Sequence, residues 1–281
     1  MLIFVALVYL FLPQNIVSDK KSMLNNAENG DFDDKTITPD IFNLVKNENK
    51  QRPQEKLLFE YVEIIDGCNS YFVGECVNVR SGPGVEYGVI TRLRNGIVLK
   101  VGEKVTYNGE DWYKIIFDEW LRYEERVSQD WYVSAPYVKS FFNEGDKELS
   151  DNELSTSTKR IIVDRSEQKL YAYNDGLLFM EESISTGLEI SPTPRGIFHV
   201  YKKTPSRYMQ GPILGISEKE YDLPGVPWNL YFTKEGAVIH GAYWHDKFGQ
   251  QWSSGCVNLS SDKAKELYMW ADLGTEILVR D

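Results

Sequence analysis

Short hydrophobic runs separated by turn residues dominate residues 57–142. These runs are rich in valine, isoleucine and aromatic residues, which is typical of strands in a small β barrel. Asn95-Gly96 and Asn108-Gly109 fall between runs and predict hairpin turns. The predicted strands are Tyr61–Ile65, Val77–Arg80, Val89–Leu93, Ile97–Val101, Trp112–Phe117 and Trp131–Val138.

From residue 159 onward the pattern again predicts β strands. Near the end of the chain, the spacing of the apolar residues instead predicts one short helix. Ile161–Val163 and Gln168–Tyr173 predict a β hairpin, and Thr275–Val279 predicts a closing strand. Between them, Ser261 is the expected N-cap of a short helix, and Gly274 follows its end. The apolar face of this helix consists of Ala264, Leu267, Tyr268 and Ala271. The pattern therefore predicts a mainly β protein with one short C-terminal helix.

Three stretches lack the strand and helix patterns and separate the chain into regions. Residues 1–18 carry no charge and are mostly apolar, which favours a signal peptide or membrane anchor over a buried N-terminal strand. Residues 19–56 are polar and poor in aromatic residues, so they predict a flexible tether. Residues 143–158 are acidic and rich in serine and threonine, which predicts an interdomain linker. The two predicted domains are therefore residues 57–142 and 159–281.

Composition narrows the class of protein. A chain of 281 residues is long enough for two modest domains, each with its own core. The net charge of -11 argues against a nucleic-acid partner, because phosphate backbones are bound by clusters of lysine and arginine. The 17 tyrosines and 7 tryptophans support a β-rich class. No feature of the sequence points to a protein partner.

The candidate chemistry lies in two short stretches of the second domain. Val238–Gly241 predicts a buried strand that ends in His240 and Gly241, and Cys256 follows Gly255 at the start of a second apolar run. A thiol with a pKa near ~8.5 is mostly protonated at neutral pH, so a nucleophilic cysteine needs a base, and His240 is the candidate. Gly255 leaves room for a substrate carbonyl and for backbone N–H groups that form an oxyanion hole. These residues predict an acyl-transfer site.

This block resembles the L,D-transpeptidase (YkuD) catalytic domain. The family signature is His-Gly, a loop, and then Ser/Thr-His-Gly-Cys, an apolar residue and Asn or Arg. Ser254 stands where many members have histidine, and because members with lysine or arginine also occur, that position is not the base. The resemblance extends from Lys159 to Val279. The matching signature residues are His240, Gly241, Ser253, Gly255, Cys256, Val257 and Asn258.

The resemblance implies a β sandwich and a role for each matching residue. Cys256 is then the nucleophile, His240 is the base, oriented by a nearby backbone carbonyl, and the N–H groups of Gly255 and Cys256 are the oxyanion donors. His199 lies within a strand pattern, and His245 lies in a loop where it is expected to shape the substrate entrance. The expected substrate-binding residues are Gly241, His245, Ser253, Ser254 and Asn258.

The resemblance also sets expectations about a lid and about cofactors. Residues 208–228, which contain several glycines and prolines, correspond to the excursion that forms a lid over the acyl-donor site in this family. Neither a metal nor a cofactor is expected, since the reaction of such an enzyme uses only the cysteine and the histidine.

The first predicted domain resembles the bacterial SH3 domain, a family that usually targets proteins to the cell wall. The resemblance covers residues 67–138, and its most specific mark is the turn Arg80–Gly84. Residues 117–130 form a longer insertion than a minimal domain needs, which predicts a flap beside a ligand groove. Cys68 and Cys76 either form a disulfide that closes a small loop or remain free thiols. A metal site there is poorly supported, because no histidine or third cysteine is near in sequence.

Together these resemblances imply an extracytoplasmic peptidoglycan L,D-transpeptidase. It is expected to act on peptidoglycan stem peptides, with 3-3 cross-links made through a cysteine acyl-enzyme from a tetrapeptide stem. An L,D-carboxypeptidase that passes the same acyl-enzyme to water is an open alternative, as is a non-catalytic cell-wall-binding protein. The NlpC/P60 peptidases are disfavoured by chain order, because their cysteine precedes their histidine.

Overall fold

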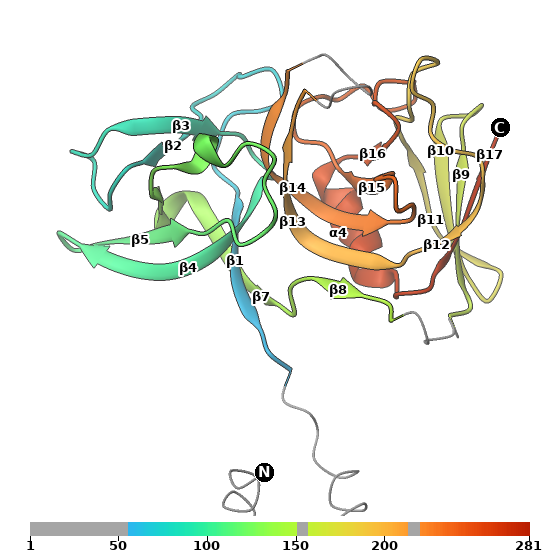
Figure 1. The fold of residues 1–281 in the computed structure, drawn as a ribbon, viewed down its shortest axis with the longest axis horizontal. Helices are drawn as coiled ribbons and strands as arrows, with labels where there is room; N and C mark the ends of the chain where they lie inside the picture. The colour runs from blue at the N-terminus through green and yellow to red at the C-terminus, as the bar shows by residue number, and fades with distance from the viewer. Residues whose placement is uncertain (1–55, 151–156, 213–219) are drawn as a thin grey trace, which may run out of the picture. The chain divides into compact units, whose positions relative to one another are not determined.

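The computed structural model describes residues 56–150, 157–212 and 220–281, all within one compact unit of the chain. These residues form three β sheets and one α-helix, so the predicted mainly β architecture is confirmed (Figure 1). The predicted signal peptide or anchor and, except for Lys56, the predicted tether lie outside the described residues. Within the described ranges, no helix combines the length and the apolar character needed to cross a membrane.

The first sheet holds the predicted barrel, with seven strands in the order β3-β2-β6-β5-β4-β1-β7. All six predicted strands are present, but the run Trp131–Val138 is divided by the 3-10 turn η4 (Ala135–Tyr137). Pro136 explains this interruption, because proline has no N–H to donate to a strand ladder. The strands are β1 (Phe59–Ile64), β2 (Val77–Arg80), β3 (Val89–Leu93), β4 (Val98–Tyr107), β5 (Glu110–Ile115), β6 (Trp131–Ser134) and β7 (Val138–Asn143).

The two Asn-Gly pairs of this domain have different roles. Asn108 and Gly109 both have positive φ angles, 52° and 82°, and they join the paired strands β4 and β5, so this hairpin prediction is confirmed. Asn95 and Gly96 also form a turn. That turn joins β3 to β4, which are not neighbours in the sheet, so the prediction of a hairpin there is wrong. The turn chemistry specified a reversal of the chain but not the pairing of the flanking strands.

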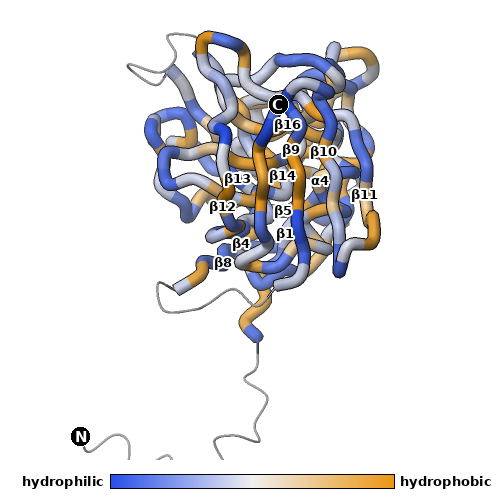
Figure 2. The backbone as a smooth tube through the Cα atoms, turned by 90° about the vertical axis from the view of Figure 1, so that its right-hand side faces the viewer, coloured by the Kyte–Doolittle hydropathy of each residue, from blue (hydrophilic) through white to orange (hydrophobic). Residues whose placement is uncertain are grey.

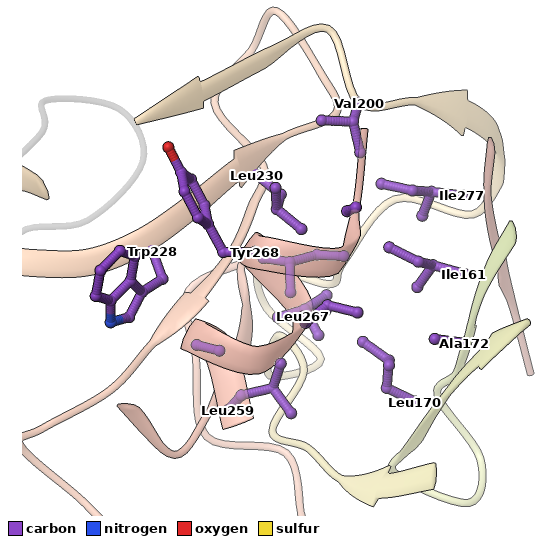
Figure 3. Close-up of a cluster of buried hydrophobic side chains, with 14 of the residues drawn as sticks. Ile161, Leu170, Ala172, Val200, Trp228, Leu230, Leu259, Leu267, Tyr268 and Ile277 are labelled. Atoms are coloured by element: carbon purple, nitrogen blue, oxygen red, sulfur yellow. The ribbon is translucent and has the colours of Figure 1, made fainter. Parts of the chain in front are cut away.

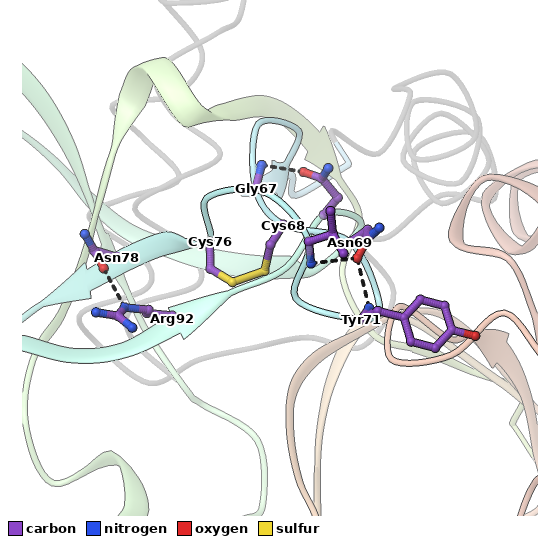
Figure 4. Close-up of a disulfide and its surroundings, with 9 residues drawn as sticks. Gly67, Cys68, Asn69, Tyr71, Cys76, Asn78 and Arg92 are labelled. Carbon is purple, nitrogen blue, oxygen red and sulfur yellow. Dashed lines mark hydrogen bonds between the residues drawn. A yellow bond between two sulfur atoms is a disulfide. The ribbon is translucent and has the colours of Figure 1, made fainter.

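Cys68 and Cys76 form a disulfide, with their Cα atoms 4.3 Å apart (Figure 4). The side-chain oxygen of Asn69 accepts hydrogen bonds from the backbone N–H groups of Tyr71 and Val73, at 2.9 and 3.0 Å, and so shapes the loop inside the ring. The Tyr71 hydroxyl donates to the Asp246 carboxylate in the second domain. The question that the sequence left open is thus settled in favour of the disulfide.

The second domain is a sandwich of two five-stranded sheets, in the orders β11-β10-β9-β17-β12 and β16-β15-β14-β13-β8. Figure 2 shows β9 as hydrophobic along its middle and hydrophilic toward its ends, and its middle residues Ile161 and Val163 are buried. The predicted hairpin is the pair β9–β10, and the predicted closing strand is β17. The strands are β8 (Lys147–Glu148), β9 (Lys159–Asp164), β10 (Lys169–Asn174), β11 (Leu177–Ser183), β12 (Gly196–His199), β13 (Lys202–Gln210), β14 (Asp222–Tyr231), β15 (Val238–Gly241), β16 (Val257–Leu259) and β17 (Glu276–Arg280).

Helix α4 (Ser261–Trp270) buries its apolar face in the core of the sandwich (Figure 3). Leu267 and Tyr268 pack there with side chains from both sheets, including Ile161 and Leu230. The predicted N-cap is wrong by one residue. The cap is Ser260, whose hydroxyl accepts from the backbone N–H of Lys263, and Ser261 is the first helical residue.

The structure describes parts of the predicted linker and of the predicted lid. Within the predicted linker, β8 pairs with β13, while residues 151–156 lie outside the described ranges. In the predicted lid, residues 208–210 belong to β13 and residues 222–228 to β14, residues 213–219 are undescribed, and the short segments 211–212 and 220–221 lie outside the strands. These two strands form a long antiparallel hairpin.

The insertion of the barrel, which contains the 3-10 turn η3 (Glu124–Val127), contacts this hairpin. The Glu119 carboxylate accepts from the backbone N–H of Tyr208 at 2.8 Å, and the Arg126 guanidinium donates to the carbonyl of Gly211 at 3.0 Å. The barrel also contributes Val98, whose carbonyl accepts from the Ser206 hydroxyl at 2.5 Å. The SH3-like barrel therefore supports the hairpin that begins and ends near the candidate site.

Candidate active site

Two parallel strands bring the histidine and the cysteine to the same part of the sandwich. Strand β15 pairs with β16 in the register Ile239 to Val257 and His240 to Asn258. Both strands are fully buried. Cys256 immediately precedes β16 and lies alongside Val238 when the same register is extended by one residue. The two predicted catalytic residues thus come from adjacent strands although a long loop separates them in sequence.

The Cys256 thiol is partly buried and is the free cysteine of the described chain. Its sulfur lies 3.9 Å from the carbonyl oxygen of Gly236, in the turn between β14 and β15. Burial raises the pKa of this thiol, while the backbone N–H of Val238 acts in the opposite direction. The resting side chain is therefore a protonated thiol at neutral pH.

The His240 ring is 2% exposed, and its Nδ1 lies 3.0 Å from the carbonyl oxygen of Gly241. Since a carbonyl only accepts, this contact places the proton on Nδ1 and leaves the lone pair of Nε2 free. Burial lowers the pKa of His240 to about 4, the Gly241 carbonyl opposes this shift, and His245 adds to it. His240 is thus a neutral imidazole, and a backbone carbonyl orients it as predicted.

No hydrogen bond joins Cys256 to His240 within the described part of the chain. The register places the cysteine about two residues, or ~7 Å, from the level of His240 along the strands. The thiol points instead toward Gly236. Hydrogen bonds between catalytic groups are often long or absent before a substrate binds, so this separation does not argue against the pair.

His245 has a different environment from His240. Its Nδ1 accepts from the backbone N–H of Lys247 at 3.1 Å, and its Nε2 lies 2.9 Å from the side-chain amide of Asn258. Because Nδ1 accepts, Nε2 carries the proton, and the network requires the amide oxygen of Asn258 to face it. Burial lowers the pKa of His245 to about 4. With both nitrogens occupied, His245 has no free basic atom, whereas His240 has one. His199 is exposed on β12, in the other sheet.

Ser253 and Gly255 give the loop before the nucleophile its shape. The Ser253 hydroxyl donates to the carbonyl of Cys256 at 2.6 Å and accepts from the N–H of Gly255 at 3.2 Å. Gly255 has a φ of +110°, which residues with a side chain rarely adopt. Of the two predicted oxyanion donors, the Gly255 N–H is therefore occupied by Ser253. The Cys256 N–H has no partner among the described residues.

The remaining predicted substrate-binding residues are mostly buried. Asn258 is 2% exposed and His245 is 6% exposed, so both side chains lie beneath the surface. Gly241 is buried against α4, where a Cβ atom would lie 2.8 Å from Pro227 and 3.0 Å from the Cα atom of Ser261. Ser254 is exposed, and its carbonyl accepts from the Ser191 hydroxyl at 3.1 Å.

A segment that the sequence did not single out holds the nucleophile loop from behind. Gly187 bridges to Ser253, and its N–H donates to the hydroxyl of Thr193 at 2.9 Å. A Cβ atom on Gly187 would lie 2.2 Å from the carbonyl oxygen of Ser191 and 2.9 Å from the Cα atom of Gly255. Only a glycine allows this approach. No hydrophobic periodicity marks such a contact, and the Ser-Thr-Gly sequence at 185–187 is the one local sign of a tight junction.

Comparison with known proteins gives matches for both domains. Residues 158–279 match the L,D-transpeptidase catalytic domain, and residues 76–139 match the bacterial SH3 domain. No curated protein matches the chain at a significant level.

Several solved structures are similar to parts of the chain. One is an L,D-transpeptidase of Enterococcus faecium, with 28% identity over 44% of this chain and 50% of that one, at a TM-score of 0.40. Another is the catalytic domain of the E. faecium enzyme acylated by ertapenem, with 27% identity over 45% and 100%, at 0.39. A third is an L,D-transpeptidase from Mycobacterium smegmatis, with 20% identity over 64% and 93%, at 0.42. The chain spans half the length of the first of these proteins.

Proposed function

Since the chain carries an L,D-transpeptidase catalytic domain behind a bacterial SH3 domain, we propose that it is a peptidoglycan L,D-transpeptidase that works through a cysteine acyl-enzyme. The observation that supports this most directly is the free Nε2 of His240. The carbonyl of Gly241 fixes the proton on Nδ1 of His240. His240 lies on β15, which pairs with β16, the strand that begins directly after Cys256. A buried neutral imidazole with a free lone pair is suited to take a proton from a thiol.

In the first step, His240 Nε2 removes the thiol proton as Cys256 Sγ attacks the carbonyl of the diamino acid at position three of a tetrapeptide stem. The carbonyl oxygen becomes an oxyanion, and the free N–H of Cys256 is the available donor to it. The C–N bond then breaks, and the imidazolium gives its proton to the amino group of the departing D-alanine. The product is a thioester. Because both resting groups are neutral, His240 acts as a general base during the attack.

In the second step, an amino group of another stem attacks the thioester. Its proton passes to His240, the C–S bond breaks, and the thiolate recovers the proton. The result is a 3-3 cross-link between two stems. If water takes the place of the amine, the same enzyme is an L,D-carboxypeptidase. No described contact favours one acceptor over the other.

The proposal places the enzyme outside the cytoplasm, held at the cell wall by the SH3 domain. The apolar residues 1–18 support export, and the polar residues 19–56 would serve as the tether. The disulfide between Cys68 and Cys76 is consistent with this location, since disulfides persist in oxidising compartments.

Intact-protein mass spectrometry after incubation with ertapenem tests the nucleophile. The wild-type protein should gain the mass of one ertapenem, and Cys256→Ala should gain none. Gln250→Ala is the matched control, because it changes an exposed residue of the loop between β15 and β16 that is not among the site residues, and it should leave the adduct in place. No adduct on the wild type, or an equal adduct on Cys256→Ala, would reject the assignment.

Purified tetrapeptide muropeptides then separate the three functions. A cross-linked dimer supports the transpeptidase, whereas a tripeptide without a dimer supports the carboxypeptidase. If neither product forms and ertapenem does not react, the chain is a non-catalytic wall-binding protein.

A further inference from the structure

A cavity of about 320 Å³ opens beside the candidate nucleophile, between β13, β14 and the turn that follows β14. Gly236 belongs to its lining, and the carbonyl of Gly236 is the atom that the Cys256 thiol contacts. The backbone at Gly236 has open space around it, because a Cβ atom there would meet nothing within 4 Å. A group held in this cavity would therefore lie close to the reacting sulfur.

The lining of this cavity is cationic in a chain whose net charge is -11. It contains Lys202, Arg207 and Lys234 against the single carboxylate of Glu148. Each cation has one carboxylate partner, but the distances are long: 3.5 Å from Lys202 to Asp146, 3.3 Å from Arg207 to Glu119, and 3.3 Å from Lys234 to Glu148. These pairs leave most of the N–H donors of the three cations unoccupied.

Tyr231 adds a polar atom that the protein does not satisfy. The side chain is 8% exposed, lines the cavity, and has a buried hydroxyl without any partner among the described residues. Its neighbour Tyr201 differs, since the Tyr201 hydroxyl donates to the carbonyl of Thr233 at 3.2 Å. A buried hydroxyl without a partner is unfavourable, and a ligand that accepts its hydrogen bond would remove this cost.

The Tyr231 hydroxyl keeps its proton at neutral pH. Burial raises the pKa of Tyr231, although Arg207 opposes this shift. The same cavity therefore contains a free hydroxyl donor, three cations and a wall that touches the thiol.

We propose that this cavity binds the terminal carboxylate of the acyl-donor stem, with Tyr231 and the cations Lys234 and Arg207 as its partners. This inference rests on the proposed function. In a tetrapeptide stem the carboxylate carbon follows the scissile carbonyl carbon by three bonds, so it lies within about 4 Å of it. When Cys256 contacts the scissile carbonyl, the carboxylate reaches the neighbouring cavity. An anion there meets donors that are otherwise unpaired.

The consequence is a rule for donor length. A stem with one residue after the scissile bond presents a carboxylate to the cavity. A stem with two residues after it presents a neutral amide at the same place and must find space for a further residue. The cavity therefore distinguishes a terminal carboxylate from a neutral amide, through charge as well as size.

Two synthetic donors test this assignment: a tetrapeptide stem with a free terminal carboxylate, and the same stem with a terminal carboxamide. Release of the last residue is measured as kcat/KM for the wild type, Tyr231→Phe and Lys234→Gln. Tyr231→Phe removes no hydrogen bond within the described protein, so its fold should be retained. Tyr171→Phe and Lys169→Gln, on β10 of the other sheet, are the matched controls.

The wild type should prefer the carboxylate donor, and Tyr231→Phe should lose about tenfold in kcat/KM on that donor alone. Lys234→Gln should lower the same preference, and the controls should keep it. The assignment is overturned if the variants lose equally on both donors, or if the wild type treats the two alike. If the wild type releases the residue from neither donor, the proposed function itself fails, and this inference fails with it.

Discussion

Glu119 is a carboxyl group buried between the barrel insertion and strand β13, and replacing it should increase stability at high pH. Its side chain is 21% exposed. One oxygen accepts from the N–H of Tyr208 at 2.8 Å, and the other lies 3.3 Å from the Arg207 guanidinium. Burial nevertheless dominates and raises the pKa of Glu119 from 4.5 to about 7, although Arg207 and the Tyr208 N–H oppose the shift.

This shift makes stability depend on pH in a defined direction. Below pH 4.5 the carboxyl is protonated in both the folded and the unfolded chain. Between pH 4.5 and 7 the folded state keeps the proton while the unfolded state releases it, so stability falls as the pH rises through the folded pKa. Above pH 7 the ionised form costs the folded state about 3 kcal/mol.

Glu119→Gln keeps an oxygen for the Tyr208 N–H and removes the charge. We therefore expect the variant to be more stable than the wild type by about 3 kcal/mol at pH 8 and by only about 1 kcal/mol at pH 5. Urea unfolding at both pH values measures the difference, and subtracting the two proteins cancels the other titrating groups. Glu189→Gln, at an exposed position, is the control.

Two outcomes would refute this reasoning. If Glu119→Gln is less stable than the wild type at pH 8, attraction to Arg207 outweighs the cost of burial. If the gap between the two proteins is equal at pH 5 and pH 8, the carboxyl does not titrate in this range.

Three further predictions concern the site and the disulfide. Burial lowers the pKa of His240 to about 4, and a base acts only when it is unprotonated. The rate of ertapenem acylation should therefore stay constant from pH 7 to pH 5 and fall below about pH 4. A decline centred near pH 6.5 would point to another base. Gly255→Ala should reduce the rate of acylation at least tenfold, since a φ of +110° costs a residue with a Cβ atom about 1–3 kcal/mol. The control is Gly88→Ala, because a Cβ atom at Gly88 would have open space around it. Equal rates for Gly255→Ala and the wild type would show that the loop adapts to the side chain. Replacing Cys68 and Cys76 together by serine should lower the free energy of unfolding by about 2 kcal/mol in a urea titration, and no loss would mean that the loop is held by other contacts.

Local features of the sequence predicted most of the strands. They also revealed the resemblances to the L,D-transpeptidase catalytic domain and to the bacterial SH3 domain. The short hydrophobic runs of the barrel, the hairpin at Asn108-Gly109 and the helix near the C-terminus all depend on neighbouring residues, so they can be recognised without the fold. The errors were local in origin too. The helix begins one residue earlier than predicted, because Ser260, and not Ser261, has the extended backbone that a cap requires. Nothing in a turn sequence shows which strands it joins, so Asn95-Gly96 was misassigned as a hairpin.

The arrangement of the site required the tertiary structure. The sequence alone identified the candidate catalytic residues, His240 and Cys256, because strand ends and glycines mark them. Only the packing of β15 on β16 decided that the Nε2 atom of His240 is free while both nitrogens of His245 are occupied. Only the fold brought Tyr231 and its cations beside the thiol. Contacts between residues far apart in sequence depend on how the sheets fold together, and no local pattern records them.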